Sequence, residues 1–419
     1  MNSVGKRPLP NGWRWVRLGE VIREAQGGFA CGERDETGVI QLRMNNVTPR
    51  GQFDWSSFIR VPADLATIAA YRLEVGDVLF NNTNSTDLVG KTALFEGYEG
   101  PVVFSNHFTR LRTFSDLLSP SFLALWLQGQ WQQRLFANIC NRWIGQSAVQ
   151  RDKLLALEIP LPSLAEQQRI AAILTEQMAT VERARAAAEA QLEAAKALPA
   201  VYFRKAFRGI TPLSVGSVRD AAPSGWRWKR LMSLARLESG HTPSRYHPEW
   251  WGGTIPWIAL PDIRDLDGRI AYETKEYTNE AGIANSSARV LPAGTVVLSR
   301  TASVGFVTIM GREMATSQDF VNWVCGPELD PHFLAFLLQA SRAYIRSLSS
   351  GAVHQTVYMP TVQAFEVCVP FLPEQQCIAT LLTEQMAAVD QARKVLEEQL
   401  DTINRLPAAL LREAFAGRL

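Results

Sequence analysis

The chain has 419 residues, of which 47% are apolar and 20% charged, the proportions of a folded protein with room for two or three domains. Its formal net charge is only +2, so composition neither requires nor excludes binding to nucleic acid. It has no apolar run of about eighteen residues and no signal-like opening segment, and its five cysteines lack CxxC spacing. These features predict a cytoplasmic protein without a membrane segment or a zinc site.

Residues 1–160 have the mixed pattern of a globular domain. They open with an aromatic pair, Trp13 and Trp15, which returns at the same spacing as Trp226 and Trp228. Because matched bulky aromatic residues usually fill cores, we interpret both pairs as packing residues within a domain or between a domain and a helix. The match is the first sign that the chain contains one unit twice.

Later elements of the two segments also match. Apolar runs beside turn-forming glycines predict strands at 75–80 and 295–298, and proline-led apolar runs predict short helices at 120–127 and 331–338. Each segment then ends in a polar loop with a glycine and an extended, proline-bearing lead. Short strands and few helices indicate an α+β domain in each segment.

The most regular feature is a long repeat, residues 166–209 and 374–417, whose copies agree at 24 of 44 positions without a gap. Both copies are rich in strong helix formers. Their apolar residues recur three or four positions apart, as Ile170, Leu174, Val181, Ala184, Ala188, Ala195 and Leu198, and as Ile378, Leu382, Val389, Ala392, Leu396, Ile403 and Leu406. This spacing predicts two amphipathic helices about 60 Å long with coiled-coil-like seams. Such repetition indicates an architecture built from one unit used twice.

We expect the two helices to cover each other's seams, because a helix this long cannot bury its apolar stripe alone. A pseudo-twofold arrangement would make them antiparallel, each with a globular domain at one end. The simpler alternative is two surface helices on separate domains. Pro199 and Pro407, at equivalent places near the helix ends, predict a kink or a stop. The expected organisation is a first domain at 1–160, a first spacer helix at 161–210, a second domain at 211–370 and a second spacer helix at 371–419.

This plan resembles the specificity subunit of type I restriction–modification systems, and the resemblance covers essentially the whole chain. Its most specific part is the entry to each helix, where Glu-Gln-Gln-x-Ile-Ala occurs twice, at 166–171 and 374–379. Pro373 and Cys377 stand where the first copy has other residues, and neither breaks the helix pattern, since proline is tolerated in a first helical turn. Runs similar to those of the family's target recognition domains occur at 79–85, 88–92, 239–244, 255–258 and 298–301, the last with Gly305.

The resemblance implies a subunit without catalytic activity of its own. Each target recognition domain would read one half of a split site in double-stranded DNA, and the paired helices would fix the distance between the halves. Two methyltransferase subunits would bring S-adenosylmethionine and modify adenine, and restriction subunits, which are motor nucleases, would use ATP and magnesium. This chain itself would hold no cofactor and no metal. The helix entries would dock partners through Glu166, Gln167, Gln168, Arg169, Glu374, Gln375 and Gln376.

Candidate DNA-binding residues come from the polar loops of both domains. Base reading uses Arg or Lys for guanine, Asn or Gln for adenine, and Ser or Thr for either. In the first domain the candidates are Asn81, Asn82, Thr83, Asn84, Ser85, Lys91, Asn106, His107 and Gln146. In the second domain they are His241, Thr242, Ser244, Arg245, Tyr246, Arg300, Thr301, Ser303, Gln318, Asp319, His354 and Gln355.

Each of these clusters also has a structural interpretation, which the sequence leaves open. Residues 81–84 suit a solvated turn, because Asn and Thr favour turns. Arg300 could pair with an acid, and the loop at 241–246 could pack internally. Gln146 and Gln355, in matching loops before the long helices, could stabilise those loops.

Two motifs imitate enzyme sites. Residues 90–92 resemble the end of a phosphate-binding loop, but Ser85 stands where that motif needs its first glycine. Asp262, Glu273 and Lys275 imitate a magnesium-dependent nuclease pattern that is frequent by chance. The histidines lack zinc-ligand spacing, and no Asn-Pro-Pro-Tyr segment of the adenine methyltransferase type occurs. The rival interpretations are therefore a self-sufficient nuclease or methyltransferase, and a coiled-coil adaptor without DNA specificity.

Overall fold

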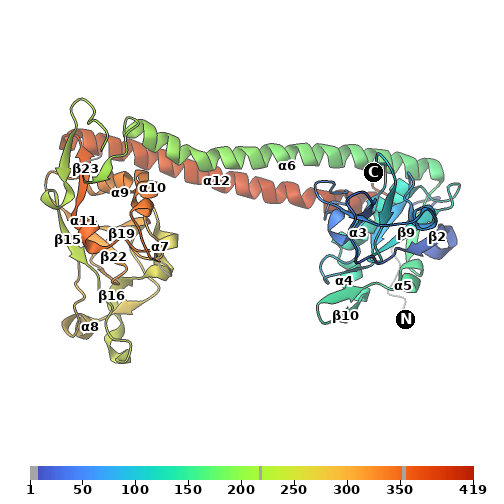
Figure 1. Cartoon of the computed structure of the whole chain (residues 1–419), viewed down its shortest axis with the longest axis horizontal. Helices are drawn as coiled ribbons and strands as arrows, with labels where there is room; N and C mark the ends of the chain where they lie inside the picture. Colours follow the sequence, from blue (N-terminus) through green and yellow to red (C-terminus); the bar gives the residue numbers. More distant parts are fainter. Residues whose placement is uncertain (1–7, 217–218, 352–354) are drawn as a thin grey trace. The chain divides into compact units, whose positions relative to one another are not determined.

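The protein divides into two compact units; in Figure 1 the globular part of unit 1 is coloured blue to teal and that of unit 2 yellow-green to orange. Unit 1 is formed by residues 1–189 together with 398–419, and unit 2 by residues 190–397. Both units are therefore α+β domains completed by a segment of each long helix. The structure, a computed structural model, describes residues 8–216, 219–351 and 355–419.

Unit 1 is built around a four-stranded antiparallel sheet in the order β2-β9-β5-β7. A second sheet, β4-β3-β8, contains one parallel pair, β3 with β8. Two smaller sheets, β10-β11-β6 and β1-β12, complete the unit. The strands are β1 (Arg14–Arg17), β2 (Ile22–Gly27), β3 (Val39–Leu42), β4 (Ile59–Val61), β5 (Val78–Asn81), β6 (Thr83–Asn84), β7 (Thr92–Leu94), β8 (Val102–Phe104), β9 (Phe108–Thr113), β10 (Asn141–Trp143), β11 (Gln146–Ala148) and β12 (Glu158–Leu161). The helices that begin in unit 1 are α1 (Leu18–Val21), η1 (Met44–Asn46), α2 (Leu65–Tyr71), α3 (Pro120–Gln132), α4 (Leu135–Ile139), α5 (Arg151–Leu155) and α6 (Leu164–Ala206).

Unit 2 repeats the two larger sheets of unit 1, with an added strand, β17, at one edge of the largest. Its largest sheet has the order β15-β22-β19-β20-β17, in which the first four strands are antiparallel neighbours as in unit 1. Its other sheets are β18-β16-β21 and β13-β23-β14. The strands are β13 (Leu213–Val215), β14 (Arg227–Arg230), β15 (Ala235–Ser239), β16 (Trp251–Ile258), β17 (Ile270–Ala271), β18 (Tyr277–Thr278), β19 (Val296–Ser299), β20 (Val307–Met310), β21 (Ala315–Thr316), β22 (Phe320–Cys325) and β23 (Phe365–Val369). The helices are η2 (Leu231–Ser233), η3 (Pro248–Trp250), α7 (Leu260–Leu266), α8 (Glu280–Ala284), α9 (Pro331–Ala340), α10 (Arg342–Ser347), α11 (Met359–Gln363) and α12 (Leu372–Ala414).

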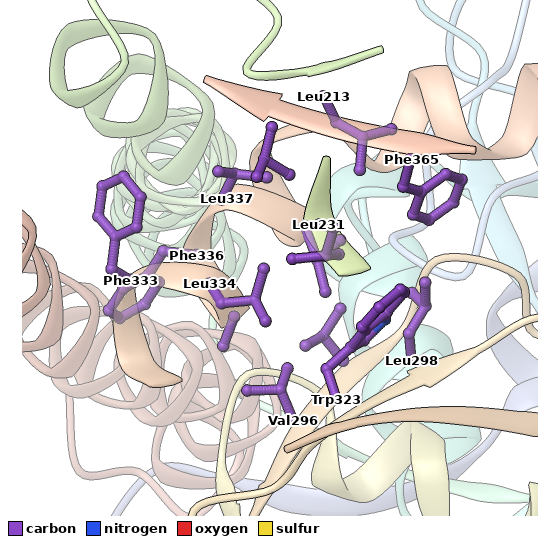
Figure 2. Packing of buried hydrophobic residues seen from close by; sticks show 14 of the residues in the cluster. Leu213, Leu231, Val296, Leu298, Trp323, Phe333, Leu334, Phe336, Leu337 and Phe365 are labelled. Carbon is purple, nitrogen blue, oxygen red and sulfur yellow. The ribbon is translucent and has the colours of Figure 1, made fainter. Parts of the chain in front are cut away.

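The main core of unit 2 lies between the large sheet and α9. Figure 2 shows Val296 and Leu298 of β19 and Trp323 of β22 on one side, facing apolar residues of α9 such as Leu334 and Leu337. All five side chains are at most 1% exposed. The proline-led run at 331–338 was thus correctly predicted to be a short apolar helix, and its burial explains why it is apolar on most faces.

The long helices pair within each unit and run antiparallel. In unit 1 the start of α6 shares a core cluster with the end of α12, through Ile170 and Leu174 on α6 and Leu411 and Ala414 on α12. In unit 2 the end of α6 shares a core with the start of α12, where Phe203 of α6 and Phe207 just after it pack in one cluster with Ala379 and Leu382. The prediction that the two long helices pack against each other is therefore confirmed, and the alternative of two separate surface helices is wrong.

The buried seam follows a stricter period than the predicted stripe. Buried positions recur every seven residues at Leu174, Val181, Ala188 and Ala195 on α6, and at intervals of seven and fourteen at Leu382, Val389 and Ile403 on α12. The stripe residues Ala184, Ala392 and Leu406 are instead exposed. A heptad seam places its second position four residues after each of the first set, which brings Arg185, not Ala184, toward the partner helix. The Arg185 side chain is 12% exposed and is held by Glu182 and Glu189.

Neither proline stops its helix. Pro199 lies inside α6, which continues to Ala206, and Pro407 lies inside α12, which continues to Ala414. The stop that we considered is therefore wrong. The final turns persist because they carry residues of the unit cores, such as Phe203 of α6. In the described part of the chain no helix is long and apolar enough to cross a membrane.

Candidate nucleic-acid interface

Three loops of unit 1 that carry predicted DNA-binding residues meet at one end of the central sheet. The loop after β5 bonds to the turn before β9, because the Asn82 amide nitrogen and the Asn81 side chain both donate to the His107 carbonyl, each at 3.0 Å. The β10–β11 hairpin joins them where Ser147 pairs with Asn84 in the small sheet. Residues between Asn81 and Ser147, from three separate loops, thus form one surface.

Unit 2 brings the equivalent loops together in the same way. The Arg300 amide nitrogen donates to the Asp319 carbonyl at 2.9 Å, and its guanidinium donates to the Gln318 carbonyl at 3.0 Å. The loop before α11 joins through a bridge between Thr301 and Thr356. The correspondence between the two units supports a common use for this end of the sheet.

A fourth loop in each unit belongs to the same surface. In unit 2 the predicted loop at 241–246 is attached by its backbone, since the His241 amide donates to the Thr316 carbonyl at 2.9 Å, and by a hydrogen bond from Thr242 to Gln318. In unit 1 the matching loop is 28–36, where the Asn106 amide donates to the Phe29 carbonyl at 3.2 Å. This unit 1 loop is not among the DNA-binding segments predicted from sequence.

A pair of glycines could have revealed it. A Cβ atom at Gly28 would lie 2.3 Å from the Ser105 carbonyl oxygen, and one at Gly240 would lie 2.0 Å from the Ser317 carbonyl oxygen. Only glycine allows the backbone to approach so closely. Gly28 and Gly240 thus fasten equivalent loops to equivalent turns, although the residues that follow them differ.

The predicted DNA-binding residues differ greatly in exposure. The exposed ones are Ser85, Asn106, Gln146, His241, Arg245, Tyr246, Gln318 and Gln355. Those of intermediate exposure are Asn82, Thr83, His107, Thr242, Ser244, Arg300, Thr301, Ser303 and Asp319. The buried ones are Asn81, Asn84 and Lys91, and His354 lies outside the described residues.

The three buried residues hold the loop together and do not face solvent. The Asn84 amide donates to the Asn81 side-chain oxygen at 2.6 Å, so the two side chains bond to each other beneath the surface. Lys91 donates to the backbone carbonyls of Met44 and Val47, and burial lowers its pKa from the usual 10.5. The prediction that these residues contact DNA is corrected to a structural role. The same burial removes Lys91 from any phosphate-binding function.

Arg245 is the best-organised cation of the interface. Its guanidinium donates to both carboxylate oxygens of Glu276, at 2.6 and 2.7 Å, and lies 3.8 Å from the ring centre of Trp251. The hydrogen bond from Arg245 lowers the pKa of Glu276, so the pair stays charged at neutral pH. The Arg245 side chain remains 51% exposed, and Tyr246 beside it is 92% exposed. This arrangement orients a cation and an aromatic ring toward solvent.

The predicted partner-binding residues also separate into two groups. Gln167 and Gln375 are buried, at 0% and 1% exposure, and are therefore corrected from docking residues to internal anchors. Gln168 and Gln376 are exposed on the first turns of the long helices. The remaining members form ion pairs: Glu166 with Arg169 at 2.7 Å, and Glu374 with Arg208 at 2.7 Å.

The nuclease-like pattern is not arranged as a metal site. Asp262 is 3% exposed, and its two carboxylate oxygens accept from the backbone nitrogens of Ala259 and Lys275, at 2.9 and 2.8 Å. Glu273 instead pairs with Arg312. Among the described residues, no group of three or more His, Cys, Asp or Glu side chains could hold a metal ion. Asp262 caps α7 and anchors the strand region after it.

Comparisons with known proteins agree with this architecture. A family model described as the type I restriction modification DNA specificity domain matches residues 10–194 and again residues 223–400. The StySPI type I restriction enzyme specificity subunit of Salmonella potsdam is 22% identical over 435 residues, which cover 99% of this chain and 91% of that protein. A chain from a structural study of complex assembly and conformational transition in a type I restriction–modification system aligns with a TM-score of 0.75 and 21% identity, covering 99% of this chain and all of that one.

The HsdS subunit of Thermoanaerobacter tengcongensis, seen in a crystal structure, aligns over the full length of both chains with a TM-score of 0.63 and 21% identity. At this level of identity the solved structures establish a shared fold. The family model establishes more, because its two matches together cover most of the sequence. The chain belongs to the type I restriction modification DNA specificity domain family.

Proposed function

We propose that this chain is the DNA-specificity subunit of a type I restriction–modification complex, in which each unit reads one half of a bipartite, non-palindromic site. One observation carries the proposal. The family model matches the chain twice, and the matches fall on two units that share one topology but present different side chains at the same end of the sheet. A common frame with different loops suits two readers with different base preferences.

The chain supplies recognition and its partners supply chemistry. Two methyltransferase subunits would carry S-adenosylmethionine, and restriction subunits would add ATP- and magnesium-dependent cleavage. The burial of Lys91 and the backbone-capping role of Asp262 argue against enzyme activity at the two motifs that imitate catalytic sites. Gln168 and Gln376, exposed at equivalent helix entries, are the partner-docking candidates that the structure leaves accessible.

The first test is a genome-wide map of N6-methyladenine in a host that expresses this chain with its methyltransferase subunit. We expect a split, non-palindromic motif that disappears when this chain is omitted. A stable complex that produces no motif would contradict the proposal and favour the adaptor interpretation. Activity of the purified chain alone that is lost in both Asp262→Ala and Glu273→Gln, while circular dichroism shows both variants folded, would instead support a self-sufficient enzyme.

A further inference from the structure

The β10–β11 hairpin of unit 1 ends in a bulky apolar tip. Trp143 pairs with Gln146 as the last register position, so that Ile144 and Gly145 form a two-residue turn, with Gly145 at φ +81°. Ile144 is fully exposed, at 106% of its reference area, and Trp143 is 60% exposed. In Figure 1 this hairpin lies on the side of unit 1 away from α6 and α12.

This tip is unusual in both chemistry and position. Two-residue hairpin turns favour Asn, Asp and Gly, and a β-branched apolar residue at such a turn has no local role. Other strongly exposed apolar residues of unit 1, such as Leu65 and Val75, stand singly in the described chain, whereas Trp143 and Ile144 are neighbours at a projecting end. Contiguous exposed apolar surface on a folded protein usually marks a contact site.

The hairpin is also fixed to the DNA-reading surface. Ser147 pairs with Asn84, and its hydroxyl lies 2.7 Å from that of Thr86 in the loop after β5. At its base the Lys153 ammonium donates to the Asn141 side chain at 2.9 Å, and Arg142 donates to the Ala137 carbonyl at 3.0 Å. Both cations are exposed, so the base of the hairpin carries positive charge, as expected of an element that approaches the phosphates of DNA.

We propose that the Trp143–Ile144 tip is a DNA wedge, in which Ile144 enters between two neighbouring base pairs and Trp143 stacks on the base face that is opened. This inference deepens the proposed function and rests on it. Proteins that kink DNA insert residues such as Ile, Leu or Phe between base steps, and aromatic rings stack on unpaired base faces. Continuity with the reading loops and the exposed cations at the base of the hairpin favour DNA over a protein as the occupant.

The test uses the full chain in complex with its methyltransferase subunit and duplexes that carry the motif from the methylation map. Stacking of one aromatic ring on a base is lost in Trp143→Ala, so we expect its Kd to rise about tenfold, and that of Ile144→Ser to rise similarly. Val75→Ser, which changes an exposed apolar residue before the other end of β5, should bind as the wild type does.

A second measurement identifies the wedge itself. A mismatch scanned through the half-site of unit 1 should tighten wild-type binding at the wedged step, because the cost of opening that step falls. The gain should disappear in Trp143→Ala, while any gain at the methylated adenine should persist in both proteins. Unchanged Kd and an unchanged mismatch profile in Trp143→Ala would overturn the wedge while leaving specific binding, and so the proposed function, intact. Loss of methyltransferase association in that variant would assign the tip to a protein contact and also overturn it.

Discussion

The buried glutamines at the helix entries should be among the largest single contributors to the stability of each unit. The Gln167 side-chain nitrogen donates to the carbonyls of Leu117 and Pro162, both at 3.0 Å, and its oxygen accepts from the Ser119 amide at 2.9 Å. Ser119 is the residue that precedes α3. One amide group thus ties the start of α6 to the start of α3 and to the end of β12.

Gln375 makes the same three bonds in unit 2. Its nitrogen donates to the carbonyls of Glu328 and Pro370, both at 3.0 Å, and its oxygen accepts from the Asp330 amide at 3.0 Å. Because the bonds are equivalent, a substitution of Gln375 should destabilise unit 2 as much as the same substitution of Gln167 destabilises unit 1. The contacts also explain why the middle residue of the repeated Glu-Gln-Gln sequence is Gln, because its side chain must both donate and accept hydrogen bonds.

Gln167→Ala should lower the free energy of unfolding of unit 1 by about 3 kcal/mol. Three backbone groups lose their partner, each unpaired buried group costs about 1–3 kcal/mol, and water entering the vacated space recovers part of the loss. The neighbouring Gln168 is exposed, so Gln168→Ala should change stability by less than about 0.5 kcal/mol. Urea unfolding followed by circular dichroism, with Gln375→Ala and Gln376→Ala as the matched pair in unit 2, measures all four.

The comparison within each pair decides the outcome. Equal midpoints for Gln167→Ala and Gln168→Ala would refute the assignment of an internal anchor and restore Gln167 as a surface residue. A large loss for Gln167→Ala without a matching loss for Gln375→Ala would refute the equivalence of the two anchors.

Three further predictions concern a loop glycine, a buried lysine and the independence of the two units. Gly28→Ala should destabilise unit 1 by about 1–3 kcal/mol and weaken DNA binding, because its Cβ would meet the Ser105 carbonyl. Gly27→Ala is the control, since a Cβ there has nothing within 4 Å, and it should change neither the thermal melt nor DNA binding. Burial lowers the pKa of Lys91 in the folded chain, so the unfolded chain holds that proton more tightly. The free energy of unfolding should therefore rise as the pH rises toward 10.5. Denaturant titrations at several pH values should show a flatter rise for Lys91→Met. Exchange of residues 1–160 for those of a relative should change one half of the methylated motif and leave the other intact, and a change in both halves would exclude independent readers.

The regular elements were predictable from sequence because each has a periodic signal. The helix repeat, the matched strands at 75–80 and 295–298 and the short helices after them all appear, and the strands shift only to β5 and β19. The seam was predicted less accurately, because an apolar stripe cannot show that a charged residue such as Arg185 lies within it. The guanidinium of Arg185 is tolerated there because two neighbouring glutamates pair with it.

The candidate site was predictable in location but not in detail. Most of the predicted polar residues lie in loops, whereas Asn81 ends β5 and Gln146 begins β11. The same chemistry that reads bases also satisfies buried backbone groups. The sequence does not show whether Asn81 and Lys91 face DNA or bond to backbone carbonyls beneath the loop, as they do in the structure. Only the three-dimensional contacts separate the two uses. The Gly28 and Gly240 anchors were missed because a lone glycine does not show which backbone it must approach.

The way in which the loops are joined explains how one frame can carry two specificities. The contacts that bring the loops together are largely main-chain bonds: the Asn82 amide to the His107 carbonyl in unit 1, and the Arg300 amide to the Asp319 carbonyl in unit 2. A main-chain bond does not depend on which side chain the residue carries. Substitution of an exposed loop residue whose side chain makes no bond between loops should therefore change what is read without loosening the surface. Substitution of a buried residue such as Asn84, whose side chain is part of the joint, should loosen the surface before it changes what is read.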